Sequence, residues 1–269
     1  MSDRKKVTVN TLKRMKEKGE KIVCLTAYDY STAAMLDESG VDLLLVGDSA
    51  GMVVAGYDST LPISMDEMVF ITKWVSRAKP KALLIADMPF GSYQPDISTA
   101  IKNATRFIQE GGADGVKIEG GKRSAETARA LVEIGIPVMG HIGMTPQSVN
   151  EFGGYKVKGK TDESHDALID DAKELQDAGV FSIVLEAVKT KTGTDITRAV
   201  DIPTIGIGAG PECDGQILVI NDLIGSYNGF EPNFVRRYAD VGNTIREAVK
   251  KFSGDVKSGD YPSADESYE

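Results

Sequence analysis

The stretch GVKIEGGKRSAETARALVEIGIPVMGHIGM, residues 115–144, indicates the fold because it contains one complete strand–helix–strand unit. Two short apolar runs, from Gly115 and from Pro137, flank the segment RSAETARALVEIG. In that segment apolar residues recur at helical spacing, and Ser124 and Gly135 are typical start and stop residues of a helix. A helix between two short strands is typical of a crossover connection, so we expect the two strands to lie parallel in one sheet.

The same alternation extends over most of the chain. Six more apolar runs of strand length begin at Lys21, Asp42, Ala82, Ser182, Pro203 and Gly215. Eight strands alternating with helices predict an α/β protein with a (β/α)8 TIM barrel, and the 269 residues are close to the about 250 that this fold takes. The runs from Pro203 and Gly215 are too close together for a full helix between them, so an open doubly wound sheet is the competing architecture.

We expect a single domain over residues 1–269, because no low-complexity linker interrupts the alternation. The charged segment at about residues 8–19 predicts a short helix that caps the bottom of the barrel. The segment at about residues 253–269 is polar and has no periodicity, so it predicts a tail or a subunit contact.

Composition narrows the class of protein. The formal net charge of −9 argues against nucleic acid or an anionic membrane as a partner, since both attract clustered Lys and Arg. Two cysteines, Cys24 and Cys213, make no disulfide framework for a chain of this length, which favours a reducing compartment. No run reaches the about 18 apolar residues of a membrane span. We therefore expect a cytoplasmic protein whose partners are small molecules.

Ionisable residues stand late in the predicted strands, where a buried parallel strand should be apolar. In a β/α barrel such positions meet at the C-terminal rim, where active sites are built. Side chains two residues apart on a strand share a face, so two apolar layers topped by a carboxylate are expected on three strands. These series are Leu44, Val46 and Asp48; Leu83, Ile85 and Asp87; and Ser182, Val184 and Glu186. Lys117 and Glu119 share a face in the same way, and His141 ends its own strand.

Three converging carboxylates, Asp48, Asp87 and Glu119, would repel one another unless a cation held them together. Ligands that are all oxygen favour Mg²⁺ over zinc or copper, and open positions on Mg²⁺ can take the oxygens of a 2-oxo acid. Glu186 is then left as a general base. Lys117 can neutralise a substrate carboxylate, and His141 can orient a substrate or carry protons.

Each of these residues also has a structural interpretation. An Asp at a strand end is a common turn former or helix N-cap, and Lys117 with Glu119 can be an ion pair at the rim. Glu186 can be a buried pair partner, and a lone His such as His141 is commonly a hydrogen-bonded structural residue.

Several long motifs resemble those of the ketopantoate hydroxymethyltransferase family. They are LTAYDYS from Leu25, VGDSAGMVVAGYDSTLPIS from Val46, ADMPFGSYQ from Ala86, VKIEGG from Val116, GHIGMTPQSVNEFGGYKVKGK from Gly140 and IGIGAGPECDGQILV from Ile205. The resemblance implies a barrel of the phosphoenolpyruvate/pyruvate superfamily. It also implies transfer of a hydroxymethyl group from 5,10-methylenetetrahydrofolate to 3-methyl-2-oxobutanoate, which gives 2-dehydropantoate on the route to pantothenate and coenzyme A. A homo-oligomer, often a decamer, would be the assembly.

The resemblance also implies roles for individual residues. Asp48 and Asp87 would hold Mg²⁺, with Glu119 completing or supporting the metal shell. The oxo acid would be bound at Asp48, Ser49, Asp87 and Lys117. Glu186 would be the proton acceptor, and His141 matches an active-site histidine of the family.

Two alternative functions remain from the residues alone. One is another magnesium-dependent lyase or mutase of the same superfamily that acts on a 2-oxo acid. The other is a non-catalytic barrel that binds a metabolite at its mouth.

Overall fold

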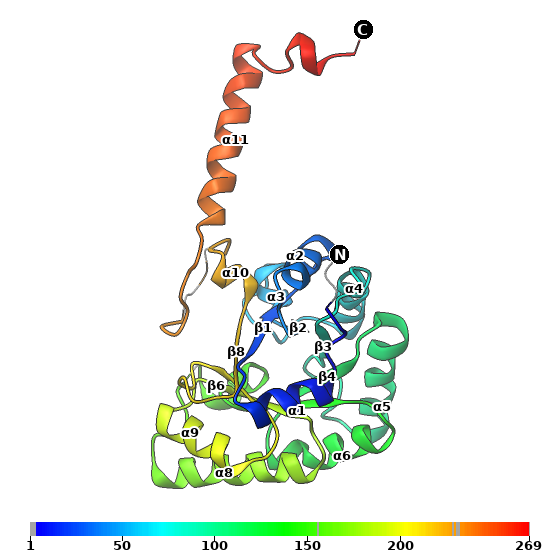
Figure 1. Ribbon diagram of the computed structural model, residues 1–269, viewed down its shortest axis with the longest axis vertical. Helices are drawn as coiled ribbons and strands as arrows, with labels where there is room; N and C mark the ends of the chain where they lie inside the picture. Colours follow the sequence, from blue (N-terminus) through cyan, green and yellow to red (C-terminus); the bar gives the residue numbers. More distant parts are fainter. Residues whose placement is uncertain (1–3, 155, 228, 230–231, 269) are drawn as a thin grey trace. The chain divides into compact units, whose positions relative to one another are not determined.

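The computed structural model describes residues 4–154, 156–227, 229 and 232–268. Its centre is a closed barrel of eight parallel strands in sequence order, which confirms the predicted (β/α)8 fold over an open sheet (Figure 1). The strands are β1 Ile22–Thr26, β2 Leu43–Val46, β3 Leu83–Asp87, β4 Gly115–Glu119, β5 Val138–Gly143, β6 Ser182–Glu186, β7 Thr204–Ile207 and β8 Gly215–Leu218. Every strand lies in one of the apolar runs that the sequence singles out.

Helices connect the strands around the outside of the barrel (Figure 1). They are α2 Tyr30–Glu38, α3 Ala50–Val53, α4 Met65–Ser76, α5 Ile97–Arg106, α6 Ala125–Glu133, α7 Val149–Phe152, α8 Asp162–Asp177 and α9 Thr190–Ala199, and a further helix, α1 Val9–Lys18, precedes β1. The π-helix η1 Phe107–Gly111 and the 3₁₀ turns η2 Lys122–Ser124 and η3 Pro146–Ser148 complete the connections. Local sequence sets their starts: Ser64, for example, forms a capping box with Glu67 at the start of α4.

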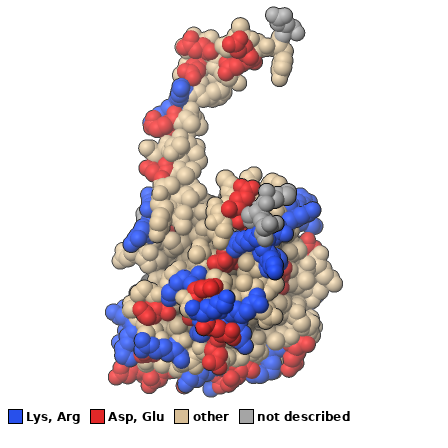
Figure 2. Space-filling view, viewed as in Figure 1, with Lys and Arg blue, Asp and Glu red and all other residues tan. Residues whose placement is uncertain are grey.

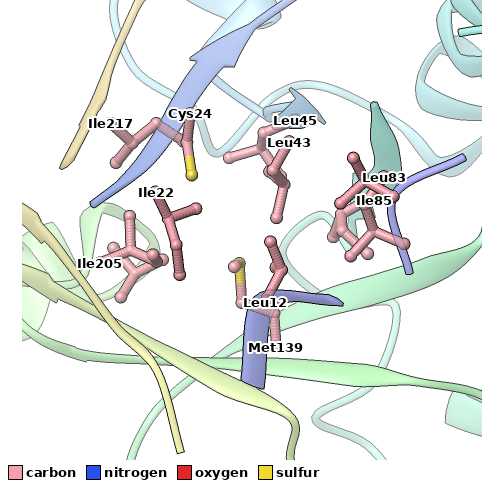
Figure 3. Close-up of a cluster of buried hydrophobic side chains, with 12 residues drawn as sticks. Leu12, Ile22, Cys24, Leu43, Leu45, Leu83, Ile85, Met139, Ile205 and Ile217 are labelled. Atoms are coloured by element: carbon pink, nitrogen blue, oxygen red, sulfur yellow. The ribbon is translucent and has the colours of Figure 1, made fainter. Parts of the chain in front are cut away.

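Side chains from seven of the strands fill the barrel interior (Figure 3). Leu12 of α1 is fully buried in the same cluster as Ile22, Leu43 and Leu83, near the starts of their strands. Thr8 and Gly19 cap α1 at its two ends. The helix thus inserts an apolar side chain between the starts of the strands.

The interior corrects one predicted strand face. Leu43 and Leu45 of β2 belong to the inner cluster, so the prediction that Leu44 and Val46 form inner layers beneath Asp48 is wrong. Because β2 ends at Val46 and the chain turns at Gly47, strand alternation does not extend to Asp48. On β3 the expected series holds, since Leu83 and Ile85 lie in the cluster and Asp87 ends the strand.

Strands β7 and β8 pair in parallel although only a loop joins them. Gly215 makes the closure with β1 feasible, because a Cβ at this position would lie 2.5 Å from the Ile22 carbonyl oxygen. Within the barrel unit, which ends at Val219, no described helix follows β8.

The chain forms two compact units, Met1–Val219 and Ile220–Glu269. The second unit contains α10 Ile220–Leu223, α11 Val241–Ser258 and the short turn η4 Ala264–Glu266. Helix α11 continues through residues 253–258, where the sequence pattern predicts a non-periodic tail. Asp240 caps its start and Gly259 ends it in a left-handed conformation, so these residues, and not polarity, set its length. The single-domain expectation for residues 1–269 stays a prediction.

Charges of both signs are interspersed on the face of the barrel unit drawn in Figure 2. Over the described residues, no helix is long and apolar enough to cross a membrane.

Candidate active site

The predicted polar residues meet at the C-terminal ends of neighbouring strands. The parallel register places Asp87 beside Lys117, Glu119 beside His141 and Gly143 beside Glu186. Asp48 follows β2 in the turn that leads to α3. Asp48, Asp87, Lys117, Glu119 and His141 are each at most 4% exposed, so their charges interact in a nearly dry environment.

Lys117 and Asp87 form a close ion pair. The Lys117 ammonium donates to both carboxylate oxygens of Asp87, at 2.7 and 2.6 Å, and lies 3.8 Å from Glu119 Oε1. Burial opposes the charge on Lys117, but attraction to Asp87 and Glu119 outweighs it and raises the pKa of the ammonium. Lys117 is therefore a fixed positive charge between two carboxylates.

His141 lies between two further carboxylates. Its Nδ1 is 3.2 Å from Glu119 Oε1, and its Nε2 is 3.3 Å from Glu186 Oε2. These are ion-pair distances, although neither contact has the geometry of a hydrogen bond. Burial and the nearby Lys117 oppose protonation, but Glu119 and Glu186 outweigh them and raise the pKa of His141 to about 9. The imidazole is therefore positively charged at neutral pH.

A glycine brings Glu186 to this position. Gly143 has a φ of +99°, and a Cβ on it would lie 2.3 Å from the Glu186 carbonyl oxygen. The close approach of β5 to β6 at the rim therefore depends on this glycine. The Glu186 side chain is 16% exposed, in contrast to the buried carboxylates.

The surroundings shift the pKa values of the three buried carboxyl groups in different directions. Burial, together with repulsion from Asp87 and Glu119, raises the pKa of Asp48 well above its usual value. Burial raises the pKa of Asp87 as well, and Lys117 only partly offsets the effect. Burial would also raise the pKa of Glu119, but attraction to His141 and Lys117 reverses this and lowers it. Of the three carboxyl groups, Asp48 thus has the least compensation from nearby positive charge.

Two residues that strand-end reasoning does not select complete the site. Gln147 donates from Nε2 to Asp48 Oδ2 at 2.9 Å, and the Tyr93 hydroxyl accepts from the Glu119 backbone N–H at 2.9 Å. Both lie inside motifs that carry the family resemblance, ADMPFGSYQ and GHIGMTPQS. The strand pattern misses them because they stand in the loops that follow the strands.

The side chain of Ser49, another predicted site residue, contacts Tyr28. Its hydroxyl lies 2.8 Å from the hydroxyl of Tyr28, and the residue is partly exposed at the start of α3. The turn after β2 therefore directs Ser49 toward Tyr28. The preceding residue, Asp48, belongs to the charged cluster that it forms with Asp87, Lys117, Glu119 and His141.

The donor set fits a hard divalent cation. In the described part of the chain, no three Asp, Glu, His or Cys side chains are arranged to hold a metal ion together. Mg²⁺ commonly takes only one or two protein carboxylates, with water and substrate as its other ligands. The buried Glu119 Oε1 lacks a hydrogen-bond partner. When all groups are ionised, the site has four negative charges, from Asp48, Asp87, Glu119 and Glu186, and two positive charges, from Lys117 and His141. One divalent cation would balance the remaining two negative charges.

Comparison with known proteins gives close relatives. The chain is 50% identical over 264 residues to 3-methyl-2-oxobutanoate hydroxymethyltransferase of Geobacter metallireducens, covering 98% of this chain and 99% of the relative. The enzymes of the same name from Syntrophus aciditrophicus and Moorella thermoacetica are 52% and 49% identical. Those alignments cover 98% and 100% of this chain, and 97% and 100% of the relatives.

Solved structures with the same fold are more distant in sequence. A 2,3-dimethylmalate lyase of the PEP mutase/isocitrate lyase superfamily has a TM-score of 0.61 at 15% identity, covering 93% of this chain and 88% of the lyase. A phosphonopyruvate hydrolase in complex with oxalate and Mg²⁺ has a TM-score of 0.59 at 13% identity, covering 97% and 93%. The model of the ketopantoate hydroxymethyltransferase family matches residues 6–264. The chain therefore belongs to the ketopantoate hydroxymethyltransferase family.

Proposed function

We propose that this chain transfers a hydroxymethyl group from 5,10-methylenetetrahydrofolate to 3-methyl-2-oxobutanoate in a Mg²⁺-dependent reaction that gives 2-dehydropantoate, in pantothenate and coenzyme A biosynthesis. The observation that carries the proposal is the buried ionic cluster at the mouth of the barrel, in a chain whose relatives have this name. The relatives' name favours the transferase over a lyase or mutase of the superfamily and over a non-catalytic barrel.

In this proposal Asp48 and Asp87 hold Mg²⁺, and Glu119 supports the metal shell. The bound ion would supply Lewis-acid stabilisation for negative charge on the ketone and carboxylate oxygens of the oxo acid. A phosphonopyruvate hydrolase of the same fold was solved with oxalate and Mg²⁺, which supports a magnesium ion as the metal of this proposal. Lys117 adds a fixed positive charge for the substrate carboxylate. A hydrogen bond from Ser49 to the substrate is proposed on the family resemblance, and the Ser49 hydroxyl contacts Tyr28 in the absence of substrate.

Glu186 is the general base in this proposal and accepts the proton from C3 of the oxo acid. It is more exposed than the other carboxylates of the site, so a substrate at the mouth can reach it. His141 contacts Glu186 and Glu119 through its two ring nitrogens. As a positively charged imidazole it can hold the Glu186 carboxylate in position, and the abstracted proton stays on Glu186. The resulting enolate attacks the methylene carbon of the folate and breaks one of its two C–N bonds. Water then replaces the second folate nitrogen, which gives the hydroxymethyl group and releases tetrahydrofolate.

Exchange of the C3 proton tests this proposal without the folate chemistry. We expect the protein with Mg²⁺ to exchange this proton of 3-methyl-2-oxobutanoate for deuterium, measured by loss of the ¹H NMR signal, with tetrahydrofolate added if needed. Glu186→Gln should slow exchange by roughly 10²- to 10⁴-fold, the usual contribution of a general base. Glu212→Gln, the same change on an exposed residue of the β7–β8 loop, should leave it unchanged. Absence of exchange in the unmodified protein, or wild-type exchange in Glu186→Gln, would contradict the proposal.

We also propose that the enzyme is a homo-oligomer, and a decamer on the resemblance to its family. In support, α11 exposes an apolar row at helical spacing, with Ile245, Val249, Phe252 and Val256 each about half exposed. A decamer of 28.9 kDa chains has a mass of about 289 kDa (10 × 28.9). Light scattering after size exclusion measures this mass, and a monomer would contradict the proposal.

We place the enzyme in the cytoplasm as part of this proposal. Cys24 and Cys213 are both buried free thiols, which fits a reducing compartment.

A further inference from the structure

Gln147 connects the loop after β5 to the charged cluster. It lies in η3, it is 5% exposed, and its Nε2 donates to Asp48 Oδ2 and to the Met88 carbonyl oxygen, each at 2.9 Å. Its backbone N–H donates to Glu119 Oε2 at 3.0 Å. One residue therefore contacts two of the carboxylates that the proposed function assigns to the metal.

The orientation of the Gln147 amide is fixed from its other side. Gln147 Oε1 accepts from the Tyr93 hydroxyl at 2.9 Å and from Gln94 Nε2 at 3.0 Å. Gln94 cannot present its oxygen there, because that oxygen already accepts from the Gly91 N–H at 2.7 Å. The Gln147 oxygen must therefore face Tyr93 and Gln94, so its NH₂ group faces Asp48.

We propose that Gln147 is a positioning residue that orients Asp48 and Glu119 for a divalent cation. A hydrogen bond to one oxygen restricts the rotation of each carboxylate, while the remaining lone pairs stay available as ligands. Partners of this kind, which do not bind the metal themselves, commonly change metal affinity by roughly 10- to 100-fold. The inference rests on the metal site of the proposed function, and it extends that site to the loop after β5.

The test removes the hydrogen bonds of the side chain and keeps its volume. Gln147→Met preserves the length of the side chain and loses its amide, both the carbonyl oxygen and the NH₂ group. Gln147→Asn keeps the amide but is one methylene shorter, so it cannot make the same contact with Asp48. Gln176→Met is the matched control. Gln176 lies near the C-terminal end of α8, its side chain also accepts a hydrogen bond, from the Asp201 N–H, and it does not contact the cluster.

Metal-free protein is titrated with Mn²⁺, and free Mn²⁺ is measured by electron paramagnetic resonance. We expect Gln147→Met and Gln147→Asn to raise the Kd for Mn²⁺ by roughly 10- to 100-fold, and Gln176→Met to leave it unchanged. Deuterium exchange of the oxo acid should recover in both Gln147 variants at saturating Mn²⁺. Circular dichroism checks that each variant is folded.

Unchanged or tighter Mn²⁺ binding in both folded Gln147 variants would overturn the inference, because Gln147 would then be only structural or would compete with the metal. Failure of the proposed function looks different: the unmodified protein would bind Mn²⁺, with a Kd that depends on Gln147, and yet would not exchange the oxo acid proton. A protein that binds no Mn²⁺ would overturn both.

Discussion

The buried ion pair between Lys117 and Asp87 gives a direct prediction for stability. Asp87→Asn keeps the shape of the side chain and removes its charge, which leaves the ammonium, with a side chain 5% exposed, without its partner at 2.6 Å. The nearest remaining carboxylate oxygen is that of Glu119, at 3.8 Å. Removal of one partner from a buried pair costs about 3–5 kcal/mol, since an uncompensated charge stays in a dry environment. We expect the free energy of unfolding to fall by the lower end of this range, about 3 kcal/mol, because Asp87→Asn also removes the repulsion between Asp87 and Asp48.

Urea unfolding of metal-free protein, followed by circular dichroism at pH 7, measures the change. Glu247→Gln is the control, since it removes one charge from the Lys250–Glu247 pair, whose side chains are 71% and 62% exposed. It should lower the free energy of unfolding by less than about 1 kcal/mol. The reasoning fails if Asp87→Asn costs no more than Glu247→Gln, because Lys117 would then find another partner or lose its proton.

Two further predictions concern the neighbouring parts of the barrel. Because contact with Glu119 and Glu186 raises the pKa of His141 from 6.5 to about 9, its protonation stabilises the metal-free fold fully below pH 6.5, and this stabilisation is lost as the pH rises through 9. The pKa difference corresponds to about 3 kcal/mol. In urea unfolding between pH 6 and 10, the free energy of unfolding of the unmodified protein should therefore decline by this amount relative to that of His141→Gln. Parallel pH dependence of the two proteins would contradict the prediction. Leu12→Ala should lower the free energy of unfolding by about 2–5 kcal/mol in urea, because it leaves a cavity among the starts of the strands, and a loss below about 1 kcal/mol would show that α1 does not seal the interior.

The sequence predicts the strands because buried parallel strands leave uninterrupted apolar runs, and each of the eight lies in such a run. It also predicts which polar residues meet, since the strand ends of a closed barrel converge. The predicted inner face of β2 is wrong, because strand alternation stops at Val46 and does not continue into the turn that carries Asp48.

Side-chain partners depend on tertiary structure and lie beyond the sequence pattern. Lys117 lies 2.6 Å from Asp87 and 3.8 Å from Glu119 on its own strand, and the closer pairing with Asp87 follows from the register of β3 and β4. Gln147 reaches Asp48 from 99 positions further along the chain, and no periodicity in its loop predicts that contact. The polar composition of residues 253–258 hides the end of α11, although the apolar row of the helix continues to Val256 and local caps define its ends.

Transfer of a labelled carbon is a direct test of whether this enzyme moves a hydroxymethyl group from the folate to the oxo acid. The unmodified protein is incubated with Mg²⁺, 3-methyl-2-oxobutanoate and 5,10-methylenetetrahydrofolate that carries ¹³C in its methylene group, and the products are analysed by NMR. We expect ¹³C in the hydroxymethyl carbon of 2-dehydropantoate, with no product when Mg²⁺ is removed or Glu186 is replaced by Gln. Absence of labelled product, or cleavage of the oxo acid without incorporation of label, would contradict it.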